Sequence, residues 1–182
     1  MSEQPADAEK EVDISDATHL DEVGDQYLTF ALAGEDYGID ILRVQEIRGW
    51  EEATRLPNAP EYVRGVVNIR GTIVPVYDLR LKFNLEFKDY DQTTVVIVIR
   101  VMSKGQVKSI GIIVDAVSDV LHGAHINITR SPDFGNEAMT EAISGLATFE
   151  GKMVVLLDVD RLLSTVEEAS NEDIDDDQQP QE

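Results

Sequence analysis

Along most of the chain, apolar residues either alternate with polar ones or form short continuous runs. Both patterns are typical of β-strands. Short helices are predicted only at the corners, at about 42–47, after Asp78 and from 159 onward. The expected strands lie in a hairpin across 26–41, near 64–69 and 72–78, in 92–101 and 107–117, and in a final hairpin across 143–158. The pattern therefore predicts a mainly β protein.

The same hairpin pattern occurs twice. It reads RGVVNIRGTIVPVYDL from Arg64 and ISGLATFEGKMVVLLDV from Ile143, and in both copies two glycines stand six residues apart, with an aspartate seven residues after the second. Upstream, GIDILRVQEI from Gly38 aligns with GIIVDAVSDV from Gly111. Four offsets that agree in order predict a duplicated unit. A unit of about five short strands suits a small closed barrel, so two similar barrels packed together are expected.

The two copies differ in charge at the turn of the repeated hairpin. Arg70 precedes the turn glycine in the first copy, whereas Glu150 precedes it in the second. Opposite charges at equivalent turns allow the two copies to select different partners, because like charges penalise the wrong one.

Composition narrows the class of protein further. The chain has 182 residues, enough for one sizeable domain or two small ones that share a core, and it has no cysteine, which excludes disulfides and zinc-thiolate sites. No N-terminal segment resembles a signal peptide, and no run of about 20 apolar residues could span a bilayer. A cytoplasmic protein without membrane insertion is expected.

Most of the negative charge lies at the two ends. The formal net charge is -21, of which residues 1–25 and residues 165–182 contribute -8 each. Such segments bury little apolar area, so we expect disordered acidic tails at 1–25 and 167–182 around one folded region at 26–166. The acidity also disfavours binding to nucleic acid.

Candidate catalytic chemistry is sparse. The sequence lacks a phosphate-binding glycine motif and a nucleophile elbow. His122 and His125 could meet on a helix, but the surrounding residues favour extended chain and offer no third ligand nearby. Asp158 and Asp160 are interpreted as a helix cap and a first-turn acid. No catalytic, cofactor or metal site is predicted; a small β-barrel hydrolase centred on the two histidines and a nucleic-acid-binding barrel are the alternatives from other classes.

Charged residues beside apolar ones indicate binding instead. Glu46 and Arg70 flank apolar positions, and either they contact a partner or they pair with each other. Arg64 and Arg70 each precede a glycine, which allows a partner to approach closely. Trp50, the only tryptophan, is either a lid on the core or an interface anchor.

Four stretches together resemble the CheW chemotaxis coupling protein family: YGIDILRVQEIRG, GVVNIRGTIVPVYDLR, TVVIVI and GIIVDAVSDVL. The resemblance covers about 26–166. It implies two intertwined five-stranded SH3-like β-barrels with short helices around a shared hydrophobic core. It also implies a non-catalytic scaffold that joins the histidine kinase CheA, through its regulatory domain, to the cytoplasmic tips of methyl-accepting chemoreceptors in membrane-associated arrays.

The resemblance also implies site residues, motif by motif. A receptor-facing groove between the barrels would include Val44, Glu46, Gly65, Arg70, Val95 and Val117. It would accept the apolar face of a receptor helical hairpin, with the two charged residues setting the register. The closest alternatives are a CheV-like adaptor and a fragment of the CheA regulatory region, whose further domains would not fit in a chain of this length.

Overall fold

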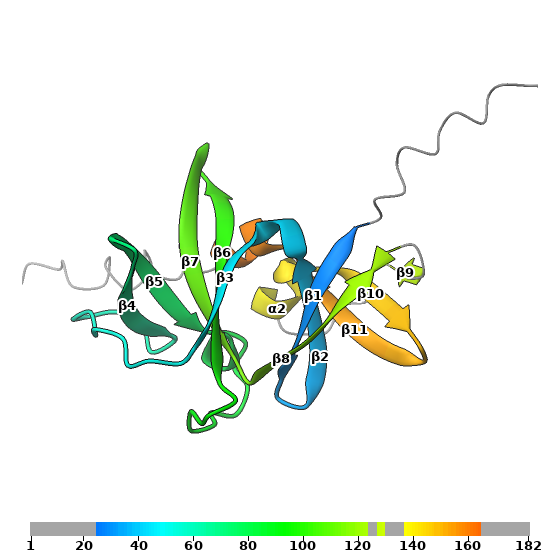
Figure 1. The fold of residues 1–182 in the computed structure, drawn as a ribbon, viewed down its shortest axis with the longest axis horizontal. Helices are drawn as coiled ribbons and strands as arrows, with labels where there is room; N and C mark the ends of the chain where they lie inside the picture. The colour runs from blue at the N-terminus through cyan, green and yellow to red at the C-terminus, as the bar shows by residue number, and fades with distance from the viewer. Residues whose placement is uncertain (1–24, 124–126, 130–136, 165–182) are drawn as a thin grey trace, which may run out of the picture.

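Two curled β-sheets lie side by side and make up most of the structure (Figure 1). The computed structural model describes residues 25–123, 127–129 and 137–164. The predicted acidic tails therefore lie outside the described residues, except for Asp25, and so does His125.

The first sheet has five strands in the spatial order β3-β6-β7-β5-β4, and the second has six in the order β8-β1-β2-β11-β10-β9. The first sheet contains β3 (Val44–Gly49), β4 (Val63–Ile69), β5 (Thr72–Asp78), β6 (Val95–Ser103) and β7 (Gln106–Val114). The second contains β1 (Gln26–Leu32), β2 (Glu35–Asp40), β8 (Ala116–His122), β9 (Asn127–Thr129), β10 (Ile143–Phe149) and β11 (Lys152–Leu157). This confirms the predicted mainly β class.

The helices are short. They are η1 (Ile41–Arg43), α1 (Leu79–Lys82) and α2 (Glu137–Ala142), and residues 159–164 are also helical. Within the described ranges, no helix has both the length and the apolar character needed to cross a membrane.

The two copies of the repeat exchange strands. The first copy runs from β1 to α1, and the second runs from β6 to the helix at 159–164. The first sheet contains β6 and β7 of the second copy with β3, β4 and β5 of the first, and the second sheet contains β1 and β2 of the first copy with β8 to β11 of the second. Two parallel pairings join the copies: Val76 lies opposite Gly111, and Leu156 lies opposite Gly38. These are the glycines that the alignment of the repeat matched, so the pairings confirm both the duplication and the intertwined arrangement.

One hydrophobic core is shared by both sheets, as predicted, and each sheet also curls around a smaller core of its own. The inner core of the first sheet consists of Ile69, Val74, Val76, Val96, Val98 and Ile113. Along β6, Ile97 and Ile99 face the shared core, whereas Val96 and Val98 face the inner core. Because β6 is buried on both faces, its apolar residues run without alternation.

Equivalent aspartates cap equivalent helices in the two copies. Asp78 Oδ1 accepts hydrogen bonds from the backbone N–H groups of Arg80 (2.8 Å) and Leu81 (3.2 Å). Asp158 Oδ1 accepts from the backbone N–H groups of Asp160 (2.9 Å) and Arg161 (3.1 Å). Both predicted caps are confirmed, because a side-chain oxygen at this position satisfies amides that the first helical turn leaves unpaired.

The predicted helix at about 42–47 is wrong. Only Ile41–Arg43 form a short 3-10 turn, and Val44–Gly49 form strand β3, which pairs with β6. Along β3, half-buried and exposed residues alternate, and Ile47 is on the exposed side. Over a few residues, apolar spacing that fits a helix also fits a strand if one apolar side chain is exposed to solvent. Here the hydrogen bonds between β3 and β6 favour the strand.

Candidate functional site

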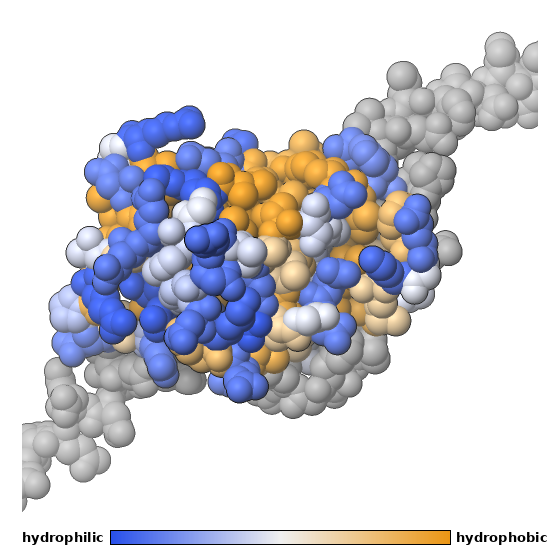
Figure 2. Space-filling model, turned by 60° about the horizontal axis from the view of Figure 1, so that its bottom comes forward, coloured by the Kyte–Doolittle hydropathy of each residue, from blue (hydrophilic) through white to orange (hydrophobic). Residues whose placement is uncertain are grey.

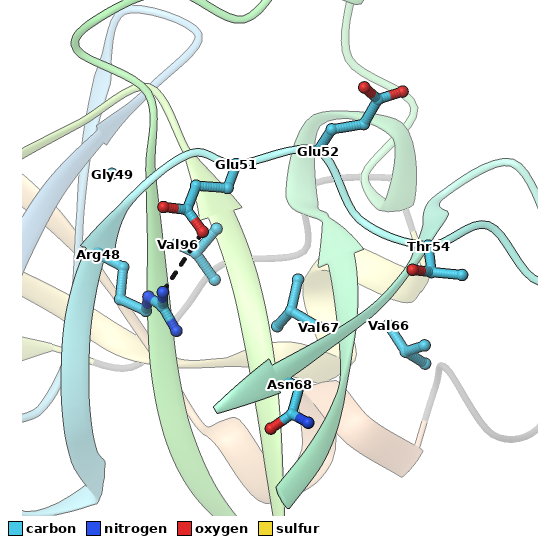
Figure 3. Close-up of a pocket in the computed structure, with 9 residues that line it drawn as sticks. All are labelled: Arg48, Gly49, Glu51, Glu52, Thr54, Val66, Val67, Asn68 and Val96. Carbon is cyan, nitrogen blue, oxygen red and sulfur yellow. Dashed lines mark hydrogen bonds and ion pairs between the residues drawn. The ribbon is translucent and has the colours of Figure 1, made fainter. Parts of the chain in front are cut away.

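The first sheet opens between its two edge strands, β3 and β4. Because the sheet curls, these edges approach each other, and two adjoining hollows lie between them. The smaller, about 170 Å³, is lined by Arg48, Gly49, Glu51, Glu52, Thr54, Val66, Val67, Asn68 and Val96 (Figure 3). The larger, about 460 Å³, is lined by Val44, Gln45, Glu46, Ile69, Arg70, Thr72, Val74, Val98, Arg100 and Ser109. The two hollows together are named the edge groove.

The floor of the edge groove is apolar. Val96 and Val98 from β6 contribute to it, with Val74 from β5 and Ile69 from β4, and all four belong to the inner core of the first sheet. Each of them exposes less than a tenth of its surface. A ligand in the groove would therefore rest on the core of the sheet without the core having to open.

Charged side chains form the rim. The Glu46 carboxylate is 3.7 Å from the Arg70 guanidinium and 3.9 Å from that of Arg48, which also pairs with Glu51 at 3.4 Å (Figure 3 shows this last pair). The sequence left open whether Glu46 and Arg70 pair with each other, and the structure shows that they do. Arg70 is 86% exposed, and an exposed ion pair contributes only about 0–1 kcal/mol to stability, so this pair remains available to a partner.

The backbone of the β4–β5 turn projects Arg70 outward. Arg70 has a φ of 51°, in the left-handed region, and the amide of the following Gly71 donates to Asn68 Oδ1 at 2.8 Å. Glu150 has a φ of 48° at the equivalent turn. The two residues therefore differ in charge but share a backbone conformation.

Gly65 allows Thr54, which forms one wall of the edge groove, to pack closely against β4. Thr54 and Val66 exchange two backbone hydrogen bonds, each 2.9 Å long, across β4. Gly65 is buried with a φ of 135°, and a Cβ atom there would overlap the Thr54 carbonyl oxygen. Only glycine allows this approach, and Gly145 occupies the matching position against Thr129 in the second copy.

The six site residues predicted from the resemblance fall into three groups. Val44, Glu46 and Arg70 line the edge groove, and Gly65 holds its wall. Val95 and Val117 are half-buried against the shared core, on β6 and β8. The prediction placed the groove between the barrels, whereas the two hollows open between the edges of one sheet. Figure 2 shows that apolar residues gather in the upper middle of one face of the molecule.

Sequence reasoning missed Arg48 and Arg100, which also line the edge groove. On a strand, Glu46 and Arg48 are two residues apart and share a face, so their pairing was detectable from period-2 spacing. The incorrect helix over this segment hid that signal.

A third hollow, of about 180 Å³, occupies the matching place in the second sheet. It is lined by Thr29, Asp36, Ser118, Asp119, Leu121, Phe149, Glu150, Lys152 and Val154. By the repeat alignment, Asp119 corresponds to Glu46, and Glu150 corresponds to Arg70. The predicted reversal of charge therefore lies on the rim of an equivalent hollow.

A half-buried ion pair between Arg80 and Asp115 lies beside α1 and connects the two sheets. Arg80 donates to both carboxylate oxygens of Asp115, at 2.7 and 2.5 Å, and the amide of Ala33 donates to the same carboxylate at 2.8 Å. Burial opposes ionisation of Asp115, but the hydrogen bonds from Arg80 and Ala33 outweigh it, and the pKa of this carboxyl lies below its ordinary value. The contact ties α1 to the β1–β2 turn.

The residues considered for metal chemistry do not form a site in the described part of the chain. His122 is exposed at the end of β8, opposite Gln26. Asp158 serves as a cap, and Asp160 pairs with Arg43 at 2.7 Å. No group of three or more histidine, aspartate or glutamate side chains in the described ranges could hold a metal ion.

Comparison with known proteins now decides the family. A family model described as the CheW-like domain matches residues 26–167. The chain belongs to the CheW family. It is 46% identical over 147 residues to the chemotaxis protein CheW of Klebsiella aerogenes, covering 81% of this chain and 86% of that one.

Two further members extend the comparison to a distant relative and to a solved structure. The chemotaxis protein CheW of Rhizobium meliloti is 32% identical over 151 residues, covering 83% of this chain and 95% of that one. The crystal structure of the scaffolding protein TtCheW from Thermoanaerobacter tengcongensis superposes with a TM-score of 0.67 at 30% identity, covering 76% of this chain and 92% of that one. The likeness supports the predicted fold of two intertwined barrels.

Proposed function

We propose that this protein is a non-catalytic scaffold that couples methyl-accepting chemoreceptors to the histidine kinase CheA. The observation that carries the proposal is the family match over nearly the whole described chain, at residues 26–167. The protein is a chemotaxis adaptor of the CheW family, and the CheV-like and CheA-fragment alternatives are not favoured.

The edge groove supports a receptor contact. Its apolar floor suits the apolar face of a helical hairpin, and Glu46 and Arg70 on its rim would set the register of the hairpin. Val44 would contact the hairpin directly, whereas Gly65 would act by holding the Thr54 wall. Val95 and Val117 would belong to the same receptor surface only if the hairpin extends toward the junction of the two sheets.

Binding of two partners at once requires two surfaces. The second sheet has its own charged hollow, so the regulatory domain of CheA can bind elsewhere than the edge groove. Contacts of modest area, about 1,200 Å² or less, are weak singly, and the repetition of contacts in an array raises the effective affinity. In this role the protein is cytoplasmic and reaches the membrane-associated arrays through its partners.

Co-sedimentation of the full chain with receptor cytoplasmic fragments and CheA tests this function. We expect the protein to appear in the pellet with both partners, and we expect Arg70→Glu to weaken the receptor contact. The matched control is Glu150→Arg, which makes the reverse change at the equivalent turn of the second copy. Failure of the unaltered protein to sediment with either partner would refute the scaffold function. Equal loss in both variants would refute the assignment of the edge groove.

A further inference from the structure

An arginine stacked on aromatic rings lies at the opposite end of β4 from Arg70. The Arg64 guanidinium carbon is 5.7 Å from the centre of the Phe87 ring and 5.6 Å from that of Tyr90. Tyr90 contacts Phe87 edge-on at 5.7 Å and Trp50 at 4.5 Å between ring centres. We name Trp50, Phe87 and Tyr90 the aromatic platform. Six residues of strand separate Arg64 from Arg70, about 20 Å, so Arg64 lies away from the Arg70 end of the edge groove, although Trp50 follows Gly49, which lines the smaller hollow.

The platform is anchored on its inner side and open on its outer side. Trp50 and Tyr90 pack against the inner core of the first sheet, and the Tyr90 hydroxyl donates to the buried Asp78 carboxylate at 2.5 Å. Phe87 leaves 44% of its surface exposed. Rigid rings that are fixed from below and open above are typical of binding hot spots, because little side-chain entropy is lost on contact.

Arg64 has unused hydrogen-bonding capacity. Its one hydrogen bond in the described part of the chain is a long one of 3.5 Å, from Nη1 to the Glu61 carbonyl oxygen, although a guanidinium carries five N–H groups. Within the described ranges, no carboxylate lies within 4 Å of Arg64 or of the neighbouring Arg55, whereas Arg43, Arg48, Arg70, Arg80 and Arg161 each have one. Stacking fixes the plane of the Arg64 fork without neutralising its charge.

We propose that Arg64 and the aromatic platform bind an acidic peptide segment of a partner protein, with a carboxylate on the Arg64 fork and an adjacent apolar side chain on Phe87. A fixed guanidinium recognises a carboxylate through two parallel hydrogen bonds. Arg55 adds a second positive charge close to Tyr90. A polyphosphate or a nucleic acid fits less well, because the chain carries a net charge of -21 and would repel a polyanion. This surface goes beyond the proposed receptor contact and does not depend on it.

The test begins with a library of phage-displayed 12-residue peptides selected on the full-length protein. The enriched peptide is then synthesised and titrated while the fluorescence of Trp50, the only tryptophan, is followed. We expect the enriched peptides to carry Asp or Glu beside an apolar residue. We expect Arg64→Gln to raise Kd about tenfold or more, as for the loss of a charge-assisted pair of hydrogen bonds. Phe87→Ser, at an exposed ring, should weaken binding as well and serves if Arg64→Gln fails to fold.

Lys104→Gln is the matched control, because Lys104 is exposed at the turn between β6 and β7, lines neither the edge groove nor the aromatic platform, and the change also removes one positive charge. It should leave Kd unchanged. Enrichment of peptides without acidic residues, no enrichment at all, or equal binding by folded Arg64→Gln would overturn the proposal. A tenfold tighter Kd after replacing the acidic residues of 172–177 by their amides would also overturn it, because the occupant would then be the chain's own acidic end.

Discussion

Replacing Gly65 by alanine should destabilise the fold by about 3–5 kcal/mol. A Cβ atom at this position would overlap the Thr54 carbonyl oxygen, so Thr54 would move away from Val66 and both hydrogen bonds between them would be lost, at a cost of about 1 kcal/mol each. The φ of 135° adds about 1–3 kcal/mol of backbone strain for a residue with a side chain. At about 2–4 °C per kcal/mol, Tm should fall by about 10 °C.

Two other glycines separate the two causes. Gly71 has a φ of 85° but nothing within 4 Å of its missing Cβ, so Gly71→Ala carries only the backbone cost of about 1–2 kcal/mol. Gly49 has open space and no left-handed φ, so Gly49→Ala should change stability by about 0.5 kcal/mol or less. Urea unfolding followed by circular dichroism measures all three variants. The reasoning is refuted if Gly65→Ala is as stable as Gly71→Ala, and loss of receptor binding in such a stable variant would make Gly65 a contact residue.

Three further outcomes are expected. Asp115→Asn should cost about 2–4 kcal/mol in urea unfolding, because Arg80 loses its ionised partner in a half-buried site. Folding lowers the pKa of Asp115, so the stability that its ionised carboxylate contributes is present above the unfolded pKa and is lost as pH falls through the folded pKa. The free energy of unfolding of the variant should therefore fall less in acid than that of the unaltered protein. The same dependence on acid pH in both proteins would contradict this. Tyr90→Phe should cost about 1–3 kcal/mol by leaving the buried Asp78 short of one donor, and unaltered stability would contradict it. Arg70→Glu should weaken receptor co-sedimentation while Tm changes by about 2 °C or less, whereas a collapsed fold would make Arg70 structural.

The site was predictable where its residues lie close in the chain or share a motif. Glu46 and Arg70 were identified from the apolar residues beside them, and they line one groove. The aromatic platform was not predictable, because Trp50 follows β3 whereas Phe87 and Tyr90 lie in the loop between α1 and β6, and no spacing rule joins the two segments. For Trp50 the sequence allowed a lid or an anchor, and the structure shows it half-buried on the inner core.

Features that depend on neighbours in the chain could be predicted from the sequence. Alternation of apolar residues identified the hairpins, glycine spacing revealed the repeat, and Asp78 and Asp158 marked the two caps, since each feature requires contacts across only a few residues. Pairing between distant strands sets which copy supplies each strand of a sheet and which strands remain at the edges. The parallel pairs Val76–Gly111 and Leu156–Gly38 join residues that lie far apart in the chain, so no local pattern specifies them. Those long-range pairings leave β3 and β4 as facing edges, so the edge groove arises from the closure of the sheet.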